Sequence, residues 1–299
     1  IIKKAVYIAR TGRPGPVLVD LPKDVQCAKA VFDYPKTCEI ASYRPVTRGH
    51  TGQIKKAMQV LLSAKRPLMY IGGGAVSTKA RALVNRFAQL TGYPVVSTLM
   101  GLGGFDGNDE KFLGMVGMHG TYEANMAMQY CDVVFAVGAR FDDRVIGCPA
   151  DFEKNPHTIV QIDIDPSSIS KNVTTDVPIV GDVYEVLKEM VKILETTTDR
   201  LNEEDLAAWD ERLNGWRAMQ CLKYTEDENG PIRPQAVIER VWKKTQGNAY
   251  VTTDVGEHQM WAAQYLKFSK PRRWMTSGGL GTMGYGFPAA VGASFAHPD

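Results

Sequence analysis

The chain is 299 residues long and has the composition of a folded globular protein, with 44% hydrophobic and 23% charged residues. This length exceeds one ordinary domain and fits two, or one and a half. The 35 basic and 33 acidic residues give a formal charge of +2, and no basic block or aromatic-basic pattern indicates a nucleic-acid partner. No apolar run is long enough to cross a bilayer, so we expect no membrane partner.

The cysteines indicate the compartment in which the protein occurs, and the chain ends indicate whether the sequence is complete. The five cysteines are widely spaced and include no C-x-x-C pair, which favours reduced thiols in a cytosol-like compartment over a disulfide framework or a zinc site: Cys27, Cys38, Cys131, Cys148 and Cys221. The opening residues, which lack an initiator Met, resemble neither a signal peptide nor a transit peptide. We therefore expect an internal piece of a longer protein.

Residues 1–48 are interpreted as the end of one domain followed by a linker. A short helical stretch opens the chain, and Pro14 and Pro16 prevent the helix from continuing. The apolar run 17–19 that follows is predicted to be a strand. We therefore assign residues 1–26 to the C-terminal end of a domain, and residues 27–48, which lose periodicity, to a linker over a surface.

Residues 49–193 show helices alternating with strands. Predicted helices occupy about 54–62, 78–91 and 121–130, and predicted strands occupy 68–71, 95–97, 133–137, 159–162 and 177–180. The strands are apolar runs without alternation, which is typical of a parallel sheet covered on both faces. The pattern predicts a complete α/β domain with a doubly wound, Rossmann-like parallel sheet, whose ligands bind beyond the carboxyl ends of the strands.

A polar stretch at 195–206 marks a second boundary, and residues 205–299 are interpreted as the start of another α/β domain. Helices are predicted at about 204–224, 234–245 and 258–266, a strand at 250–253, and an apolar small-residue helix near 288–293. The chain ends before such a domain would be complete.

Several polar or glycine-rich segments follow the predicted strands. Gly72–Gly74 could let the backbone approach a phosphate or could be an ordinary flexible turn. Residues 138–144 hold two arginines and two aspartates; they are either an exposed ion-pair cluster or a set that binds phosphate and ribose-type hydroxyls. Because Asp163 also follows a strand, a nucleotide-type ligand at this sheet edge is favoured.

Two other segments leave their interpretation open. His119 could be a base, a ligand, a hydrogen-bond donor, a helix cap or a buried filler. The glycine run at 277–284 could present main-chain amides to a diphosphate or could be a close-packed turn. The residue types in these two segments do not by themselves decide between the alternatives.

Together, these segments resemble acetohydroxyacid (acetolactate) synthase catalytic subunits of the thiamine-diphosphate enzyme superfamily. The matching phrases are GRPGPVLVDLPKDV at 12–25, GMHGTYEANMAMQYCDVVFAVGARFDDR at 117–144, QIDIDPSSISKNV at 161–173, and DVGEHQMWAAQ and SGGLGTMGYGFPAAVGA near the end. The resemblance implies three domains: the end of a pyrimidine-binding domain at 1–26, an FAD-binding domain at 49–193, and the N-terminal part of a diphosphate-binding domain at 205–299.

The resemblance also implies the cofactor contacts. FAD would meet Arg13, Gly72, Gly73, Gly74, Thr98, Leu99, His119, Gly138, Arg140, Asp142, Arg144, Val145, Asp163, Ile164, Asp182 and Val183. Thiamine diphosphate would meet Val255, Gly256, Glu257, His258, Gly281 and Met283, and Lys23, Met118 and Asp143 would line the substrate channel. Glu257 departs from the family, which commonly has Gln there, and an acid beside a diphosphate is unfavourable unless it is protonated, turned away or paired.

The implied reaction is the decarboxylation of pyruvate and transfer of the hydroxyethyl unit to pyruvate or 2-ketobutyrate, giving acetolactate or acetohydroxybutyrate for branched-chain amino acid synthesis. It uses thiamine diphosphate, Mg²⁺ and a structural FAD. The resemblance places the activating glutamate before Ile1 and the metal-binding motif after Asp299, so residues 1–299 alone are expected to be inactive. A homodimer or higher oligomer, a regulatory small subunit, and a bacterial cytoplasmic, plastid or mitochondrial location are further expectations.

Two alternative functions remain open on the sequence. A pyruvate oxidase or glyoxylate carboligase shares both cofactors, and only the oxidase would use the flavin for redox chemistry. The central domain could instead be a nucleotide-binding module of a non-catalytic subunit.

Overall fold

A six-stranded parallel sheet forms the centre of the computed structural model, which describes residues 1–227 and 229–298. Its strand order is β3-β2-β1-β4-β5-β6, and every neighbouring pair is parallel. The strands are β1 (Pro67–Ile71), β2 (Val95–Ser97), β3 (Phe112–Met115), β4 (Val133–Val137), β5 (Thr158–Asp163) and β6 (Val177–Val180). This topology confirms the predicted doubly wound α/β fold. Glu228 and Asp299, both within the predicted third domain, lie outside the described residues.

Helices cover both faces of this sheet, and alternate strand residues enter two separate cores. One core joins Met69 and Ile71 of β1 to α3 (Thr51–Leu62), α4 (Thr78–Thr91) and α7 (Val183–Thr196). The other core joins Leu68 and Tyr70 to α5 (Tyr122–Tyr130) and α8 (Glu203–Arg217). Burial on both faces explains why these strands are continuously apolar in sequence.

Side-chain caps fix where the helices of this domain begin. The Ser77 hydroxyl accepts the N–H of Ala80 at the start of α4, and the Thr121 hydroxyl accepts the N–H of Ala124 at the start of α5. Each cap satisfies one of the N–H groups that a first helical turn leaves without an intrahelical partner. Helix α4 ends at Gly92, whose φ of 71° is the left-handed conformation that glycine adopts without strain.

The predicted central helices and strands are confirmed, but β3 and α7 were not predicted. β3 is four residues long and contains Gly114 at a φ of 102°, so it carries neither the length nor the composition of a typical strand. The apolar residues of α7 have helical spacing and face the core: Val183, Val186, Leu187, Met190, Val191 and Leu194. Short elements fill the connections: η1 (Gly73–Ala75), η2 (Leu99–Gly101), η3 (Pro166–Ser168) and α6 (Pro149–Phe152).

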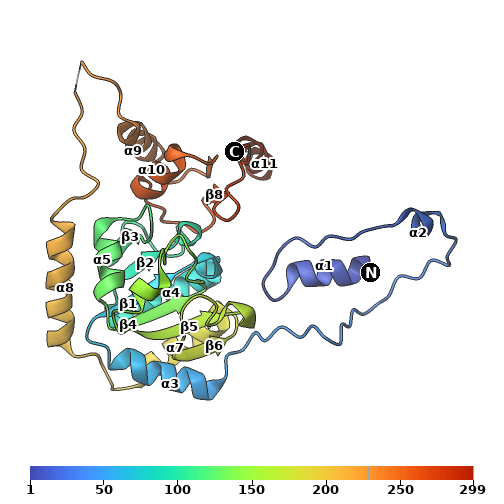
Figure 1. Ribbon diagram of the computed structural model, residues 1–299, viewed down its shortest axis with the longest axis horizontal. Helices are drawn as coiled ribbons and strands as arrows, with labels where there is room; N and C mark the ends of the chain where they lie inside the picture. The colour runs from blue at the N-terminus through green and yellow to red at the C-terminus, as the bar shows by residue number, and fades with distance from the viewer. Residues whose placement is uncertain (228, 299) are drawn as a thin grey trace.

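The first 48 residues form an arm that extends away from the central domain and joins it at its last residues, just before α3 (Figure 1). It contains α1 (Ile2–Arg10) and the short helix α2 (Lys23–Cys27), neither of which has a buried residue. The predicted strand at 17–19 is wrong, since these residues belong to no strand and pair with none of the described strands, and Leu18 is 94% exposed. Apolar residues alone do not make a strand when no neighbouring strand accepts their hydrogen bonds.

The C-terminal part contains α9 (Pro234–Thr245), β7 (Val251–Thr253), α10 (Glu257–Tyr265), β8 (Trp274–Thr276) and α11 (Gly286–Ala296). β7 and β8 pair in parallel as a two-stranded sheet, and β8 was not predicted. This part packs against the central domain through an apolar cluster that joins Leu102 and Met115 to Leu266, Phe268 and Trp274. No described helix has the length and apolar character required to span a membrane.

Helix α8 ends at Arg217, so the prediction of a helix to 224 was too long. Trp209 of this helix is 1% exposed, lies in the same core as α5, and donates its indole N–H to the Pro67 carbonyl over 3.0 Å. Figure 1 shows α8 beside α5 at the edge of the central domain. Although α8 lies at the predicted start of the third domain, its buried face therefore stabilises the central sheet.

Replacing Trp209 by Ala should lower the free energy of unfolding of the full-length protein by about 3–5 kcal/mol, because a large buried side chain is removed. Trp209→Phe retains most of the apolar surface and should cost about 1 kcal/mol through the lost hydrogen bond. Urea unfolding followed by circular dichroism measures both values. Equal stability of the Ala variant and the parent would contradict this role.

Candidate functional site

The strand order reverses between β1 and β4, and this point of the sheet defines the candidate site. The chain passes from β1 outward to β2 and β3, and then returns to β4 and continues in the opposite direction to β5 and β6. The connections after β1 and β4 therefore diverge and leave a crevice beyond the carboxyl ends of the strands.

Glycine backbone forms the floor of this crevice. The Gly72 N–H donates to the Val137 carbonyl over 3.0 Å, and the Gly74 N–H donates to the Gly138 carbonyl over 3.2 Å. Gly138 has a φ of 60°, and a Cβ at this position would lie 2.7 Å from the Gly74 Cα. The two turns therefore interlock only because they have no side chains.

A cleft of about 1490 Å³ extends from this floor to the C-terminal part of the chain. It brings together residues predicted as cofactor contacts from every segment: Arg13, Gly72, Gly73, Gly74, Thr98, Leu99, His119, Gly138, Arg140, Asp142, Arg144, Val145, Asp163, Ile164, Asp182, Val183, Val255, Gly256, Glu257 and Gly281. His258 and Met283 are not part of its wall, nor are the predicted channel residues Lys23, Met118 and Asp143. The cleft exceeds the typical volume of a small-molecule pocket, so it has room for a large or composite ligand.

The wall of the cleft suits an anionic ligand. Six arginines line it against four acidic residues: Arg10, Arg13, Arg44, Arg140, Arg144 and Arg272, with Asp142, Asp163, Asp182 and Glu257. Among the described residues, no ion pair joins Arg140 or Arg144 to Asp142 or Asp143, which argues against an exposed ion-pair cluster. The guanidinium groups of Arg140 and Arg144 are therefore available for phosphate oxygens.

Asp163 ends β5 and is 7% exposed. Its carboxylate accepts the N–H of Asp165 over 2.9 Å, and its carbonyl accepts the N–H of Gly181 over 2.9 Å. Burial raises the pKa of Asp163, while the hydrogen bond from Asp165 opposes that rise. Arg13 of the N-terminal arm lies 3.4 Å from the Asp165 carboxylate, which attaches the arm to the same rim.

Gln161 is a buried polar residue that was not predicted to belong to the site. It is 1% exposed; its amide group donates to the Ala139 carbonyl over 3.1 Å, and its side-chain oxygen accepts the Thr175 hydroxyl over 2.8 Å. It therefore supports the turn after β4 from behind. The signal was present, since Gln161 is a polar residue within the otherwise apolar run of β5.

His119 is exposed on the cleft wall, so it is not a buried filler. Thr121 makes the cap of α5, which removes the cap interpretation for His119 as well. The His119 carbonyl accepts a hydrogen bond from the Gln264 side chain over 2.9 Å, which joins α10 to the central domain.

The linker contributes to the cleft more than the sequence predicted. Tyr43 and Thr47 line the wall, and the Tyr43 hydroxyl donates to the Thr11 carbonyl over 2.9 Å. The Asp182 N–H donates to the Thr47 carbonyl over 2.8 Å, so the returning arm is attached to the end of β6. No periodic pattern in 27–48 indicated this role.

The C-terminal wall consists of the turns after β7 and β8. Gly278, which follows β8, lies against the Met100 side chain of the central domain, and a Cβ at Gly278 would lie 2.5 Å from the Met100 sulfur. Asp254, which follows β7, accepts the N–H groups of Val255 at 2.8 Å and Gly284 at 2.9 Å. These turns are ordered by contacts within the protein and face the same cleft.

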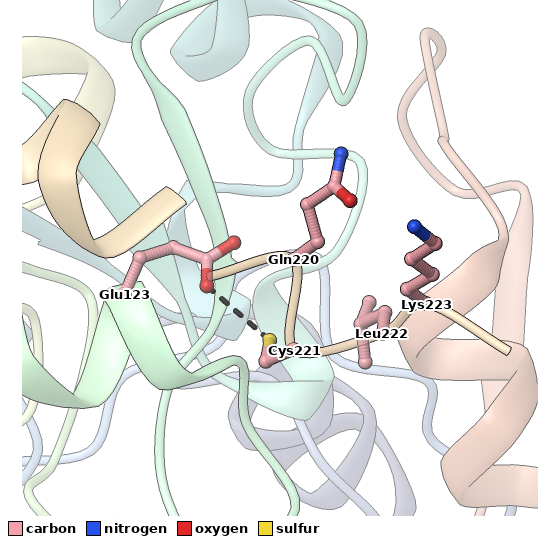
Figure 2. A pocket seen from close by; sticks show the side chains of 5 residues that line it. All are labelled: Glu123, Gln220, Cys221, Leu222 and Lys223. Atoms are coloured by element: carbon pink, nitrogen blue, oxygen red, sulfur yellow. Dashed lines mark hydrogen bonds between the residues drawn. The ribbon is translucent and has the colours of Figure 1, made fainter. Parts of the chain in front are cut away.

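A separate pocket of about 400 Å³ lies between α5 and the segment after α8 (Figure 2). Glu123 and Cys221 face each other there, with 3.3 Å between a carboxylate oxygen and the sulfur, and the Tyr122 N–H donates to the same sulfur over 3.3 Å. Burial and the neighbouring Glu123 raise the pKa of the Cys221 thiol. This cysteine is thus a protonated structural contact and not an activated nucleophile.

No group of three or more potential metal ligands occurs within residues 1–227 and 229–298. The cleft therefore provides backbone amides, arginines and scattered carboxylates as its binding groups.

Comparison with known families agrees with this geometry. Residues 54–190 match the model described as "Thiamine pyrophosphate enzyme, central domain", and residues 254–299 match "Thiamine pyrophosphate enzyme, C-terminal TPP binding domain". The chain belongs to the thiamine pyrophosphate enzyme family. The two matched regions correspond to the six-stranded domain and to the turns after β7 and β8.

Individual relatives are acetolactate synthase large subunits. The chain is 50% identical to acetolactate synthase isozyme 3 large subunit of Escherichia coli K12, over all of this chain and 52% of the relative. It is 49% identical to the large subunit of Buchnera aphidicola subsp. Schizaphis graminum, with 100% and 52% covered, and 46% identical to that of Corynebacterium glutamicum, with 100% and 47% covered. The family resemblance seen in the sequence is confirmed, and the chain spans about half the length of these relatives.

Replacing Gly138 by Ala should lower the free energy of unfolding by about 1–3 kcal/mol, because a left-handed backbone is forced on a residue with a Cβ that meets Gly74. Gly147→Ala is the matched control, since no atom lies within 4 Å of its added Cβ. Thermal unfolding of both variants of the full-length protein measures the difference. If the two substitutions cost the same, the interlocked turns do not constrain the site.

Proposed function

We propose that the whole protein to which this chain belongs is an acetohydroxyacid synthase catalytic subunit. It would decarboxylate pyruvate and transfer the two-carbon unit to pyruvate or 2-ketobutyrate, giving acetolactate or acetohydroxybutyrate. The observation that carries the proposal is the 50% identity to a large subunit over the entire chain. The convergence of the predicted cofactor residues on one cleft supports it.

The central part of the cleft fits FAD. Its glycine floor allows a flat or phosphorylated ligand to approach the backbone, and a Cβ at Gly74 would fill part of that floor, 2.9 Å from the Gly138 Cα. Arg140 and Arg144 would bind the diphosphate, and Asp163 and Asp182 would accept ligand hydroxyl groups. FAD would have a structural role, as a group that joins the central domain to the arm and to the C-terminal turns.

The C-terminal wall fits the diphosphate end of thiamine diphosphate. The first N–H groups of α10 have no intrahelical acceptor, and they lie beside Val255 and Gly256 on the wall. Gly281 would add main-chain contacts, Met283 would support the cofactor, and His258 would lie next to it, although the last two are outside the cleft wall. When bound, thiamine diphosphate supplies the electron sink that permits loss of carbon dioxide from a 2-keto acid.

The Glu257 carboxylate is compatible with a neighbouring diphosphate because solvent and the helix dipole stabilise its charge. It is exposed and occupies the first turn of α10, where the helix dipole stabilises a carboxylate. We propose that its side chain points to solvent and that its backbone N–H, not its carboxylate, faces the cofactor.

The remaining assignments concern the metal ion, the substrate channel, the partner subunits and the cellular location. Mg²⁺ would accompany the diphosphate, and Lys23, Met118 and Asp143 would line the channel that delivers the second keto acid. Relatives named large subunits support a separate regulatory small subunit, and we propose a homodimer or higher oligomer as the assembly. The bacterial relatives support a location in the bacterial cytoplasm.

The full-length protein with thiamine diphosphate, Mg²⁺ and FAD should convert pyruvate to acetolactate and carbon dioxide, with no lasting bleaching of the flavin. Acetolactate is measured after acid conversion to acetoin, and flavin absorbance is followed in the same reaction. Omission of thiamine diphosphate is the control and should abolish the product. Stoichiometric flavin reduction by pyruvate would indicate an oxidase instead, and absence of carbon dioxide release would exclude a catalytic subunit.

Arg140→Ala should weaken FAD binding about tenfold to a hundredfold, because a charge-assisted hydrogen bond to phosphate is worth about 1.5–3 kcal/mol. Arg86→Ala is the matched control; Arg86 pairs with Glu195 on the surface, 2.9 Å away, and does not line the cleft. Fluorescence titration of the apoprotein with FAD measures both. Unchanged affinity in Arg140→Ala would remove this residue from the flavin site.

A further inference from the structure

Asp254 is a carboxylate placed where an anionic ligand is expected, and its hydrogen bonds resolve that apparent conflict. One carboxylate oxygen accepts the N–H of Val255 over 2.8 Å and of Gly284 over 2.9 Å. The other accepts the same Gly284 N–H over 2.9 Å and the Gly286 N–H over 3.4 Å. Three main-chain N–H groups thus hold the carboxylate, and these hydrogen bonds lower the pKa of Asp254.

These bonds join the two turns that form the C-terminal wall of the cleft. Val255 and Gly256 connect β7 to α10, whereas Gly284 ends the glycine run and Gly286 is the first residue of α11. Gly286 lies directly on the end of β7, since a Cβ there would be 2.6 Å from the Asp254 nitrogen. Asp254 therefore fixes the distance between the α10 N-terminus and the glycine run.

A second polar contact orders the glycine run from its other end. The Ser277 hydroxyl accepts the Thr282 N–H over 2.9 Å. The run between these two anchors, residues 278–281, contains three glycines and would otherwise be free to adopt many conformations. The glycine run is thus held at both of its ends, by the Ser277 hydroxyl at one end and by the Asp254 carboxylate at the other.

We propose that Asp254 is a positioning residue, which holds the α10 N-terminus and the glycine run at the separation that a diphosphate requires before the cofactor arrives. This inference rests on the proposed function. Asp254 itself does not touch the cofactor; its role is to remove the conformational entropy that the glycine run would otherwise lose on binding.

The test compares Asp254→Asn with the parent in the full-length protein. Asn has the same shape but directs an N–H₂ group at N–H donors, so at least one of the main-chain hydrogen bonds is lost. Asp132→Asn is the matched control, because Asp132 also accepts two main-chain N–H groups, from Lys65 and Arg66, each over 2.9 Å, and lies at the opposite edge of the sheet.

Two measurements separate this inference from the proposed function. Without cofactors, hydrogen exchange of a peptide covering 277–286 should be about tenfold faster in Asp254→Asn and unchanged in Asp132→Asn. With Mg²⁺ present, the Kd for thiamine diphosphate should rise about tenfold or more, while the Kd for FAD stays within about twofold.

Each outcome bears on one proposal. Unchanged exchange in Asp254→Asn overturns the positioning role, and so does a parallel loss of FAD, which would indicate general misfolding. Faster exchange together with a parent protein that binds no thiamine diphosphate would retain Asp254 as the anchor of these turns and overturn the proposed function instead.

Discussion

The contact between the bare backbones of Gly72–Gly74 and Gly138 is the constraint on which the site depends. It brings the ends of β1 and β4 together at the point where the strand order reverses, and the remaining strand ends are arranged around it. A side chain at either turn would push the other turn away from the crevice. Because the sheet is rigid and buried on both faces, a change at this contact would be transmitted to every group on the same edge.

The cleft joins three parts of the chain that are distant in sequence. The arm contributes Arg13 and Tyr43, the central domain contributes the glycine floor, and the C-terminal part contributes the turns after β7 and β8. Direct contacts already connect these parts, such as the hydrogen bond from Gln264 to the His119 carbonyl and the packing of Gly278 on Met100. A ligand that spans the cleft would add contacts to all three, which would give the proposed flavin a structural role without redox chemistry.

The sheet architecture could be predicted from the sequence because it is determined by which residues are buried. Continuous apolar strands separated by amphipathic helices allow few arrangements, and the structure adopts the expected one. The polar residues at 138–144 and Asp163 were also placed correctly at one sheet edge, since the carboxyl ends of parallel strands meet there. The failures have different causes: β3 is interrupted by Gly114, and residues 17–19 have apolar side chains but no neighbouring strand.

Residues that act through the backbone were the hardest to predict. Gln161, Asp182 and Asp254 were either missed or assigned only as ligand contacts, yet the structure shows each accepting or donating hydrogen bonds to main-chain groups of the site's own turns. A family motif does not separate the two roles, because both place a polar side chain at a strand end. Geometry does separate them, since a carboxylate has about four lone-pair sites and those used by turn N–H groups are not available to a ligand.

The difference between carboxylates that bind turns and carboxylates that bind ligands explains how a site for anions can contain several acidic residues. Four acidic residues line a cleft proposed to hold two diphosphates, which would be unfavourable if each carboxylate faced the ligand. Asp182 accepts the N–H groups of Tyr184 and Glu185, and Asp163 accepts that of Asp165, so main-chain donors of the protein occupy part of each carboxylate. Such a site combines acids that order its own loops and helix starts with arginines that face the ligand. The carboxylates then make the site more rigid. They weaken its affinity for anions less than carboxylates facing the ligand would.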